Sequence, residues 1–254
     1  MQITGSSAIV TGAASGLGAA TATALAAAGA QVVGFDLATG WERAGAPGVG
    51  ITAASGDVTS PDDVAAAIST ATGLAPLRLA VNCAGIGTAG RILSRKGVHD
   101  LDIFSRVVSI NLIGSFDMIR HAASQMSRLD PTESGDRGAI VNIASVAAFD
   151  GQIGQAAYAA SKGGLVGLTL PVARDLSAAA IRLNTVAPGL IETPIYDFAP
   201  DPEAFKVQLG QSVLHPKRLG TAEELASMVM ECLTNSYMNA ETVRVDGGIR
   251  MPPK

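Results

Sequence analysis

Three side chains between residues 145 and 162 could move a proton: the Ser145 hydroxyl, the Tyr158 phenol and the Lys162 ammonium. Tyr158 and Lys162 are four residues apart, about one helical turn, so a helix would place them on the same face. A free phenol has a pKa near ~10, too high for a base at neutral pH, but a neighbouring cation lowers it. In a site shielded from water, with a second positive charge nearby, a drop of ~3 pKa units, or roughly 4 kcal/mol, is attainable. Ser145 could then hold a substrate oxygen while Tyr158 moves the proton.

A tyrosine and a lysine at this spacing are by themselves more often an ordinary helix face, so the rest of the chain decides the interpretation. Residues 7–11 form a short apolar run, Gly12, Gly16 and Gly18 follow, and an alanine-rich helix is expected over residues 19–28. A strand, a glycine turn and a helix in this order present backbone N–H groups and a helix N-terminus to a pyrophosphate. The predicted ligand is a dinucleotide, whose oxidised nicotinamide is the second positive charge that the phenol needs.

The acidic residue Asp36 indicates which dinucleotide is bound. It ends the next expected strand, residues 31–36, and lies 18 residues beyond Gly18. At about this offset a carboxylate meets the adenosine ribose hydroxyls. The same carboxylate would repel a 2′-phosphate, and Leu37 and Ala38 offer no arginine to bind one. NAD is therefore favoured over NADP; the alternative is an aspartate that only caps a helix or a turn.

Further polar residues and glycines at strand ends are candidates for the same site. Asn82 follows the strand expected over residues 77–81 and could join neighbouring strands through its amide, while Gly85 lets a ligand approach the backbone. Asp57 could accept a hydrogen bond from an adenine amino group or simply cap a turn. Asn111 lies inside an expected helix, where a buried amide is costly unless satisfied, so it either binds a water locally or belongs to the active site.

Two segments are expected to shape access to the site. Pro188 and Gly189 form a turn where the backbone would pass the nicotinamide, and Thr193 could hold a carboxamide or a phosphate. Residues 196–213, within a substrate region of about 190–215, are expected to form a mobile lid. The irregular stretch 86–99 is either a solvated loop or a rim that meets substrate phosphates, and it carries three cations, Arg91, Arg95 and Lys96.

Strands and helices alternate along the whole chain, with no linker, repeat or low-complexity segment. This alternation predicts a single α/β domain over residues 1–254, a Rossmann-type doubly wound parallel sheet flanked by helices. Residues 37–50 are expected to be irregular, and the helix over 101–128 is expected to be irregular near 111–114. The expected strands are 7–11, 31–36, 51–54, 77–81, 139–143, 181–186 and 242–245. The expected helices are 19–28, 61–72, 101–128, one that holds Tyr158 and Lys162 and runs to 177, and one that starts with a capping box at Thr221.

Composition narrows the class of protein. Hydrophobic residues make up 48% of the chain and charged residues 16%, which is enough to bury a large core. The net charge is −4 without a run of Lys or Arg, which disfavours nucleic acid and anionic membranes as partners. The N-terminus lacks the pattern of a signal peptide, and Cys83 and Cys232 lack the companions of a metal or redox motif. We therefore expect a soluble cytoplasmic protein with two core thiols and no metal site.

Taken together, the ordered motifs resemble the short-chain dehydrogenase/reductase family. They are Thr-Gly-Ala-Ala-Ser-Gly-Leu-Gly at 11–18, Asn-Cys-Ala-Gly at 82–85, Asn111, Ser145, Tyr-Ala-Ala-Ser-Lys at 158–162 and Pro-Gly at 188–189. The resemblance covers essentially the whole chain and implies a catalytic tetrad of Asn111, Ser145, Tyr158 and Lys162. It implies that these residues bind NAD: Gly12, Ser15, Gly16, Leu17, Gly18, Asp36, Asp57, Val58, Asn82, Ala84, Gly85, Tyr158, Lys162, Pro188, Gly189, Ile191 and Thr193. The one departure is Cys83, where the family more often has a second asparagine.

A narrower resemblance, carried by the runs at 151–164, 168–176, 187–194 and 245–251, is to family members that oxidise the 3-hydroxyl group of acyl-CoA thioesters with NAD. It implies a homotetramer, and it implies Gln155 as a substrate contact beside Ser145 and Tyr158. A related dehydrogenase of a steroid or another secondary alcohol is the alternative. A catalytically silent dinucleotide-binding protein is a third hypothesis, against which the intact serine, tyrosine and lysine argue.

Overall fold

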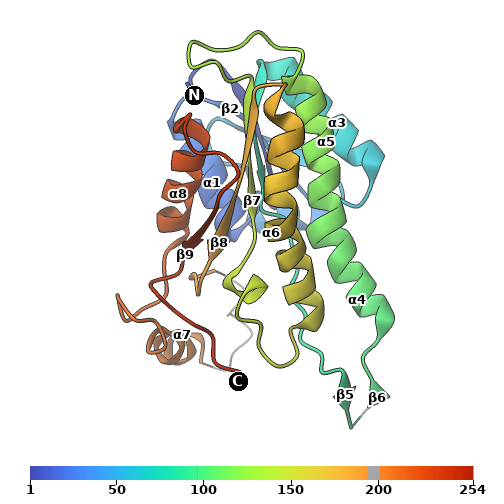
Figure 1. Cartoon of the computed structure of the whole chain (residues 1–254), viewed down its shortest axis with the longest axis vertical. Coiled ribbons are helices and arrows are strands. Elements are labelled where there is room, and N and C mark those ends of the chain that lie inside the picture. Colours follow the sequence, from blue (N-terminus) through green and yellow to red (C-terminus); the bar gives the residue numbers. More distant parts are fainter. Residues whose placement is uncertain (96, 194–200, 254) are drawn as a thin grey trace.

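The computed structural model describes residues 1–95, 97–193 and 201–253, and its centre is a parallel β-sheet (Figure 1). The sheet has seven strands in the order β3-β2-β1-β4-β7-β8-β9, and each pair of neighbours runs parallel. The strands are β1 (Ser7–Thr11), β2 (Gln31–Asp36), β3 (Ile51–Ser55), β4 (Leu77–Asn82), β7 (Gly138–Ile143), β8 (Ile181–Pro188) and β9 (Thr242–Val245). Each begins and ends within two residues of its prediction, which confirms the expected Rossmann-type α/β fold.

Helices cover both faces of this sheet, which explains why its central strands are apolar without alternation. Successive residues of a strand face opposite sides, so Ile9 packs in the core under one helical layer and Val10 in the core under the other. Figure 1 shows α1 (Gly16–Ala27) and α8 (Ala222–Thr234) on one side of the sheet. On the other side lie α3 (Pro61–Leu74), α5 (Gly114–Met126) and α6 (Ala156–Ser177).

The predicted irregularity near residues 111–114 is a π-helical turn. Helix α4 (Leu101–Val108) continues into a π-helix at Ser109–Ile113, and α5 follows without a break. A π-helical turn holds one more residue than an α-helical turn, and such turns are often found at functional sites. Asn111 lies inside this turn and is fully buried.

One prediction of irregular structure was wrong. Helix α2 (Ala38–Ala44) lies within the segment 37–50. It is held by Trp41, whose ring lies against Gly34 and whose Nε1 donates a hydrogen bond to the Ala54 carbonyl at 3.2 Å. The stretch 86–99 is irregular, as predicted, apart from a short antiparallel hairpin of β5 (Leu93–Ser94) and β6 (Gly97–Val98). Lys96 lies outside the described residues. In addition, α1 begins at Gly16 rather than at residue 19, because the end of the glycine turn is itself the first turn of the helix.

The predicted lid is only partly described. Residues 194–200 lie outside the described residues, and α7 (Pro202–Gly210) follows them, with the Asp201 carboxylate accepting a hydrogen bond from the Ala204 N–H at 3.1 Å. Helix α8 begins with the predicted capping box between Thr221 and Glu224. The function of residues 196–213 as a lid remains a prediction.

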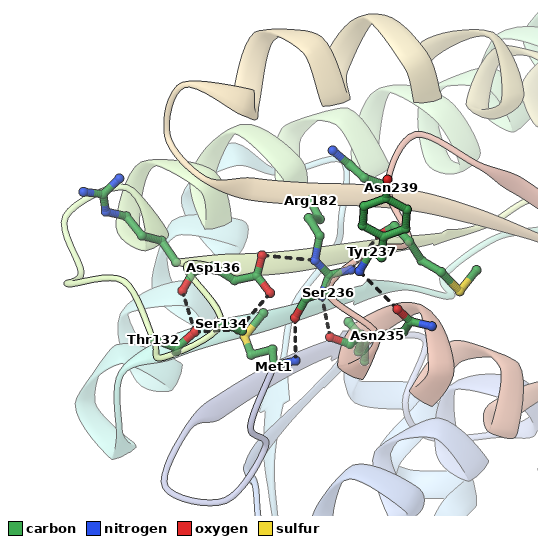
Figure 2. A network of polar contacts seen from close by, with 12 residues as sticks. Met1, Thr132, Ser134, Asp136, Arg182, Asn235, Ser236, Tyr237 and Asn239 are labelled. Atoms are coloured by element: carbon green, nitrogen blue, oxygen red, sulfur yellow. Dashed lines mark hydrogen bonds and ion pairs between the residues drawn. The ribbon is translucent and has the colours of Figure 1, made fainter.

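A buried arginine, Arg182, connects several elements at the amino-terminal ends of the strands (Figure 2). Arg182, the second residue of β8, pairs with Asp136 at 3.2 Å. Its guanidinium also donates to three main-chain carbonyls just within and beyond α8, those of Cys232, Leu233 and Met238, at 2.7–2.8 Å. A cation is favourable at the C-terminus of a helix, so Arg182 joins β8, the loop before β7 and α8.

Candidate active site

A cleft of about 870 Å³ lies at the carboxyl ends of the strands, where open α/β sheets bind their ligands. All of the predicted cofactor-binding residues except Asn82 line it. Asp36, Asp57 and Val58 line the cleft at the ends of β2 and β3, whereas Ser145, Tyr158 and Lys162 line it beyond the end of β7. Strands β1 and β4 lie between β2 and β7 in the sheet, so the two groups mark opposite ends of the cleft. The elements that place these two groups come from the first and the second half of the chain, so the cleft spans both.

The glycine turn between β1 and α1 forms the floor of the cleft. A Cβ atom on Gly18 would lie 2.1 Å from the Gly12 carbonyl oxygen, and one on Gly12 would lie 2.9 Å from the Ala84 nitrogen. Gly12 also has a φ of +67°, a backbone conformation that favours glycine. The turn therefore requires glycine at both positions, and it leads the first N–H groups of α1 to the cleft, where they suit a pyrophosphate.

Two main-chain N–H groups hold the Asp36 carboxylate at the edge of the cleft. Its Oδ2 accepts from the Ala14 N–H at 2.9 Å and its Oδ1 from the Leu37 N–H at 2.7 Å. Oxygen lone pairs remain for further donors, so the ribose hydroxyls of an adenosine fit this position.

Two arginines at the cleft were not predicted as site residues. Arg43, on the last turn of α2, and Arg106, on α4, both line the cleft and are exposed. Arg43 was missed because the segment that carries it was expected to be irregular. Ser109 and Ile110 of the π-helix also line the cleft, and the sequence gives no signal for them beyond the expected irregularity.

Tyr158 and Lys162 lie on one face of α6, as their spacing predicts, and Ser145 faces them from the turn after β7. The Ser145 hydroxyl accepts a hydrogen bond from the Ala147 N–H at 3.1 Å. The Lys162 ammonium is 5.8 Å from the centre of the Tyr158 ring and donates to the Ile143 carbonyl at 2.7 Å. The hydroxyl, the phenol and the cation are thus held together at one end of the cleft.

Burial decides the protonation of this group. It raises the pKa of Tyr158, and a hydrogen bond with Ser145 acts in the opposite direction. The expected lowering of the phenol pKa by Lys162 is therefore not seen in the protein alone. Burial also lowers the pKa of Lys162 to about 8. The neighbouring Cys83 thiol does not compensate, because burial raises its pKa to about 12 and it is neutral at pH 7.

Asn111 lies behind the cleft rather than in its lining. Its amide bonds to the main chain of Ile86 and to the Ser161 hydroxyl. Gly85 separates Asn111 from Lys162, because a Cβ atom there would lie 3.1 Å from the Asn111 Oδ1 and 3.3 Å from the Lys162 Nζ. The structure therefore brings the four predicted tetrad residues together, with Asn111 in contact with the backbone that flanks Lys162.

Two further predicted site residues, besides Asn111, lie outside the cleft lining. Asn82 is buried in the sheet, where its Nδ2 donates to Asn142 of β7 at 2.8 Å and thereby joins neighbouring strands, as one of its two predicted roles requires. Gln155 precedes α6, and its Oε1 accepts from the Gln152 N–H at 3.0 Å. A substrate contact by Gln155 remains a prediction.

Comparison with known proteins gives the class. The family model described as short chain dehydrogenase matches residues 6–203. Together with the sheet and the site described above, this match shows that the chain belongs to the short-chain dehydrogenase family. It is therefore an oxidoreductase, of a family that generally depends on NAD or NADP.

The relatives define the class more narrowly. The chain is 46% identical to 3-hydroxyacyl-CoA dehydrogenase type-2 from Bos taurus over 99% of its length and 98% of that protein. It is 48% identical to the enzyme of the same name from Drosophila melanogaster, over 96% of this chain and 97% of the other. A crystal structure of 3-hydroxyacyl-CoA dehydrogenase type-2 from Mycobacterium avium superposes with a TM-score of 0.90 over 100% of both chains at 42% identity. Among the described residues, no helix is long and apolar enough to span a membrane.

Proposed function

We propose that this protein interconverts 3-hydroxyacyl-CoA and 3-ketoacyl-CoA thioesters with NAD as its cofactor. The observation that carries the proposal is the arrangement of Ser145, Tyr158 and Lys162 at one end of a cleft whose other end is formed by Asp36. The substrate class is supported by the relatives named above, which align with this chain over nearly its whole length.

The roles of the residues follow from their positions. Ser145 holds the substrate oxygen by a hydrogen bond, and Tyr158 transfers a proton to or from that oxygen. Lys162 is a buried cation whose Nζ is bonded to one carbonyl, so it has donors left for ribose hydroxyls. When bound, the oxidised nicotinamide supplies the hydride acceptor and a positive charge that favours the phenolate. We propose that a water near Asn111 links Lys162 to solvent for proton exchange.

The choice of NAD rests on Asp36. Its carboxylate is fixed by two N–H groups at the edge of the cleft, where it can accept from ribose hydroxyls and would repel a 2′-phosphate. Arg43 lies at the same end, and its cation weakens this discrimination without removing it, because Asp36 is anchored and Arg43 is exposed.

We also propose a homotetramer. Apolar side chains are exposed along the neighbouring helices that run from α4 to α6, among them Ile103, Ile113, Phe116 and Leu170, at 42–57% of their full exposure. Exposed apolar groups of this kind are typical of subunit interfaces. Light scattering of the protein as it elutes from a size-exclusion column measures the mass of the assembly directly. The mass of a monomer would contradict the proposed tetramer.

The function is tested by the absorbance of NADH. We expect fast oxidation of NADH by acetoacetyl-CoA, little reaction with NADPH, and the loss of nearly all turnover in Tyr158→Phe with NADH affinity almost unchanged. Turnover of Tyr158→Phe at the wild-type rate would refute the mechanism. Reduction only of a steroid or a simple ketone would contradict the acyl-CoA assignment and favour the alternative substrate. NADH binding without turnover of any of them would indicate a silent dinucleotide-binding protein.

A further inference from the structure

The segment between the serine and the tyrosine of the site is itself held by the far end of the chain. We define the catalytic loop as residues 146–155 and the C-terminal segment as residues 249–253. The Ile153 N–H donates to the Pro253 carbonyl at 3.0 Å, and the Gln152 Nε2 donates to the Pro252 carbonyl at 3.0 Å. The C-terminal segment therefore runs beside the catalytic loop.

Apolar contacts join the same two segments. Val146 of the catalytic loop, Ile249 of the C-terminal segment and Val213, which follows α7, form one small buried cluster. Leu190 and Met251 pack against it. Ile249 is fully buried, so the C-terminal segment is anchored by packing in this cluster and does not merely touch the surface.

Arg244 on β9 is the polar centre of this contact. Its Nη2 donates to the Asp150 carboxylate at 2.8 Å and to the Ile249 carbonyl at 2.9 Å, and its Nε donates to Asp246 at 2.7 Å. Its guanidinium carbon lies 5.2 Å from the centre of the Phe149 ring. One side chain thus contacts the catalytic loop, the C-terminal segment and the turn after β9. The hydrogen bond from Arg244 also holds the pKa of Asp150 below its usual value.

A short chain of bonds connects Arg244 to the site. Asp150, which Arg244 binds, donates its own N–H to the Val146 carbonyl at 2.9 Å. Val146 opens the short 3₁₀ turn Val146–Ala148, and the Ala147 N–H of that turn donates to the Ser145 hydroxyl. A shift of Asp150 would therefore be passed to the oxygen that is to hold the substrate.

We propose that Arg244 is a positioning residue, which fixes the Ser145 hydroxyl relative to the Tyr158 phenol by clamping the catalytic loop to the C-terminal segment. The proposal rests on the proposed function, because it assigns Arg244 an effect on turnover. Errors of about 1 Å in a catalytic group can lower rates by up to ~100-fold. Arg244 is only partly buried, its side chain being 21% exposed, so we expect a smaller effect of about tenfold.

Arg250, on the C-terminal segment, offers a matched control for Arg244. It is also an arginine and also binds Asp246, at 3.3 Å, but its side chain is 65% exposed, and its other bond goes to the Ile249 carbonyl. Arg244→Met should lower kcat with acetoacetyl-CoA about tenfold, with the dissociation constant of NADH changed less than twofold. Arg250→Met should leave both values within twofold. Arg244→Lys, which keeps the cation but loses the planar fork, should recover part of kcat.

Two further measurements separate positioning from general stability. Hydrogen–deuterium exchange should rise in peptides covering residues 146–155 of Arg244→Met and stay unchanged in those covering β1 and α1. In a Ser145→Ala background, Arg244→Met should cost less than twofold, since its effect passes through Ser145. The proposal would be overturned if Arg244→Met lowered kcat by the same factor in the wild-type and Ser145→Ala backgrounds. It would also be overturned if Arg244→Met changed neither the hydrogen–deuterium exchange of residues 146–155 nor kcat. If the wild type itself turned over no ketone, the proposed function would fail instead, while the exchange experiment would still test the clamp.

Discussion

The side chain of Asn111 forms two hydrogen bonds with the main chain of Ile86, as a neighbouring strand would. The Asn111 Oδ1 accepts from the Ile86 N–H at 2.8 Å, and its Nδ2 donates to the Ile86 carbonyl at 2.9 Å. The second Nδ2 proton goes to the Ser161 hydroxyl at 3.0 Å. One amide therefore joins the π-helix, the turn after β4 and α6.

Because the Asn111 amide makes these hydrogen bonds, we predict that Asn111→Ala lowers the stability of the fold as well as the enzymatic activity. The substitution leaves the Ile86 N–H and carbonyl without their partner, which costs ~1–3 kcal/mol for each group that stays dry. We expect the free energy of unfolding in urea to fall by about 2–4 kcal/mol. Asn235→Ala removes an exposed amide that donates to Glu231 and accepts from the Tyr237 N–H. Water can replace both bonds at the surface, so this control should cost less than about 1 kcal/mol. Equal urea concentrations at the unfolding midpoints of the wild type and Asn111→Ala would contradict the prediction.

Lys162 is predicted to reduce stability at neutral pH. Its pKa falls from 10.5 to about 8 in the folded protein, so the unfolded chain binds more protons than the folded chain between these pH values. The free energy of unfolding of the wild type should then rise with pH across this window, and the cost of the buried cation, roughly 3 kcal/mol, is fully present below it.

Lys162→Met should therefore raise the melting temperature at pH 7 while abolishing turnover. Loss of the bond to the Ile143 carbonyl offsets part of the gain, so we expect about 1–2 kcal/mol. The difference from wild type should shrink as the pH rises from 7 to 10. Lys217→Met, at an exposed position, controls for the loss of a surface cation. A variant less stable than wild type at every pH would show that the cation stabilises the site.

Asp36 and Arg43 make a paired prediction about the cofactor. Asp36→Ala removes the acceptor of the ribose hydroxyls, which should raise the KM of NADH about tenfold or more, and it removes the charge that repels a 2′-phosphate. NADPH should then become a usable substrate because Arg43 remains at that end of the cleft.

The double variant Asp36→Ala/Arg43→Met tests this reading. It should lose the NADPH activity gained by the single variant and keep the weakened NADH activity. If the gain persists, another cation binds the phosphate, and Arg106 would be the next substitution. A wild type that already prefers NADPH would refute the role given to Asp36.

The buried pair of Arg182 and Asp136 (Figure 2) should matter for stability and not for catalysis. Arg182→Met leaves Asp136 charged and buried and removes the donor of three carbonyls, which should cost about 3–5 kcal/mol. The double variant Arg182→Met/Asp136→Asn removes the unpaired charge and should recover part of this loss. The free energy of unfolding of the single and the double variant is measured by urea denaturation. The kcat of the folded variants should stay within twofold, since the pair lies at the other end of the strands.

The motifs of the site were predictable from the sequence because each depends on local chain geometry. Gly18 is required by a contact within the glycine turn, and Gly12 has the positive φ that favours glycine. Tyr158 and Lys162 share a face of one helix. The strand boundaries were equally predictable, because buried parallel strands appear in the sequence as apolar runs that end at turn residues.

Features made by distant contacts were not predictable. Helix α2 depends on Trp41 meeting Gly34 and Ala54 across the sheet edge, and without α2 the position of Arg43 could not be foreseen. Arg244 lies 94 residues from Asp150 in the chain, so no spacing rule relates them. The depth at which the Tyr158 phenol is buried, which raises its pKa in the protein alone, could not be foreseen for a similar reason, because the sequence shows the cation but not the burial. The lowering of this pKa by a bound oxidised nicotinamide remains a prediction.

The π-helical turn at Ser109–Ile113 constrains the length of the chain as well as its composition. A π-helical turn takes up one more residue than an α-helical turn, so the extra residue is accommodated without changing the relative orientation of α4 and α5. Deleting one residue from the turn would restore a regular α-helical turn and shift the residues of the turn around the axis. Asn111 would then lose its two hydrogen bonds to Ile86, while α5 could keep its place on the sheet. Through evolution, this stretch should accept replacements of its outward-facing side chains and reject insertions and deletions.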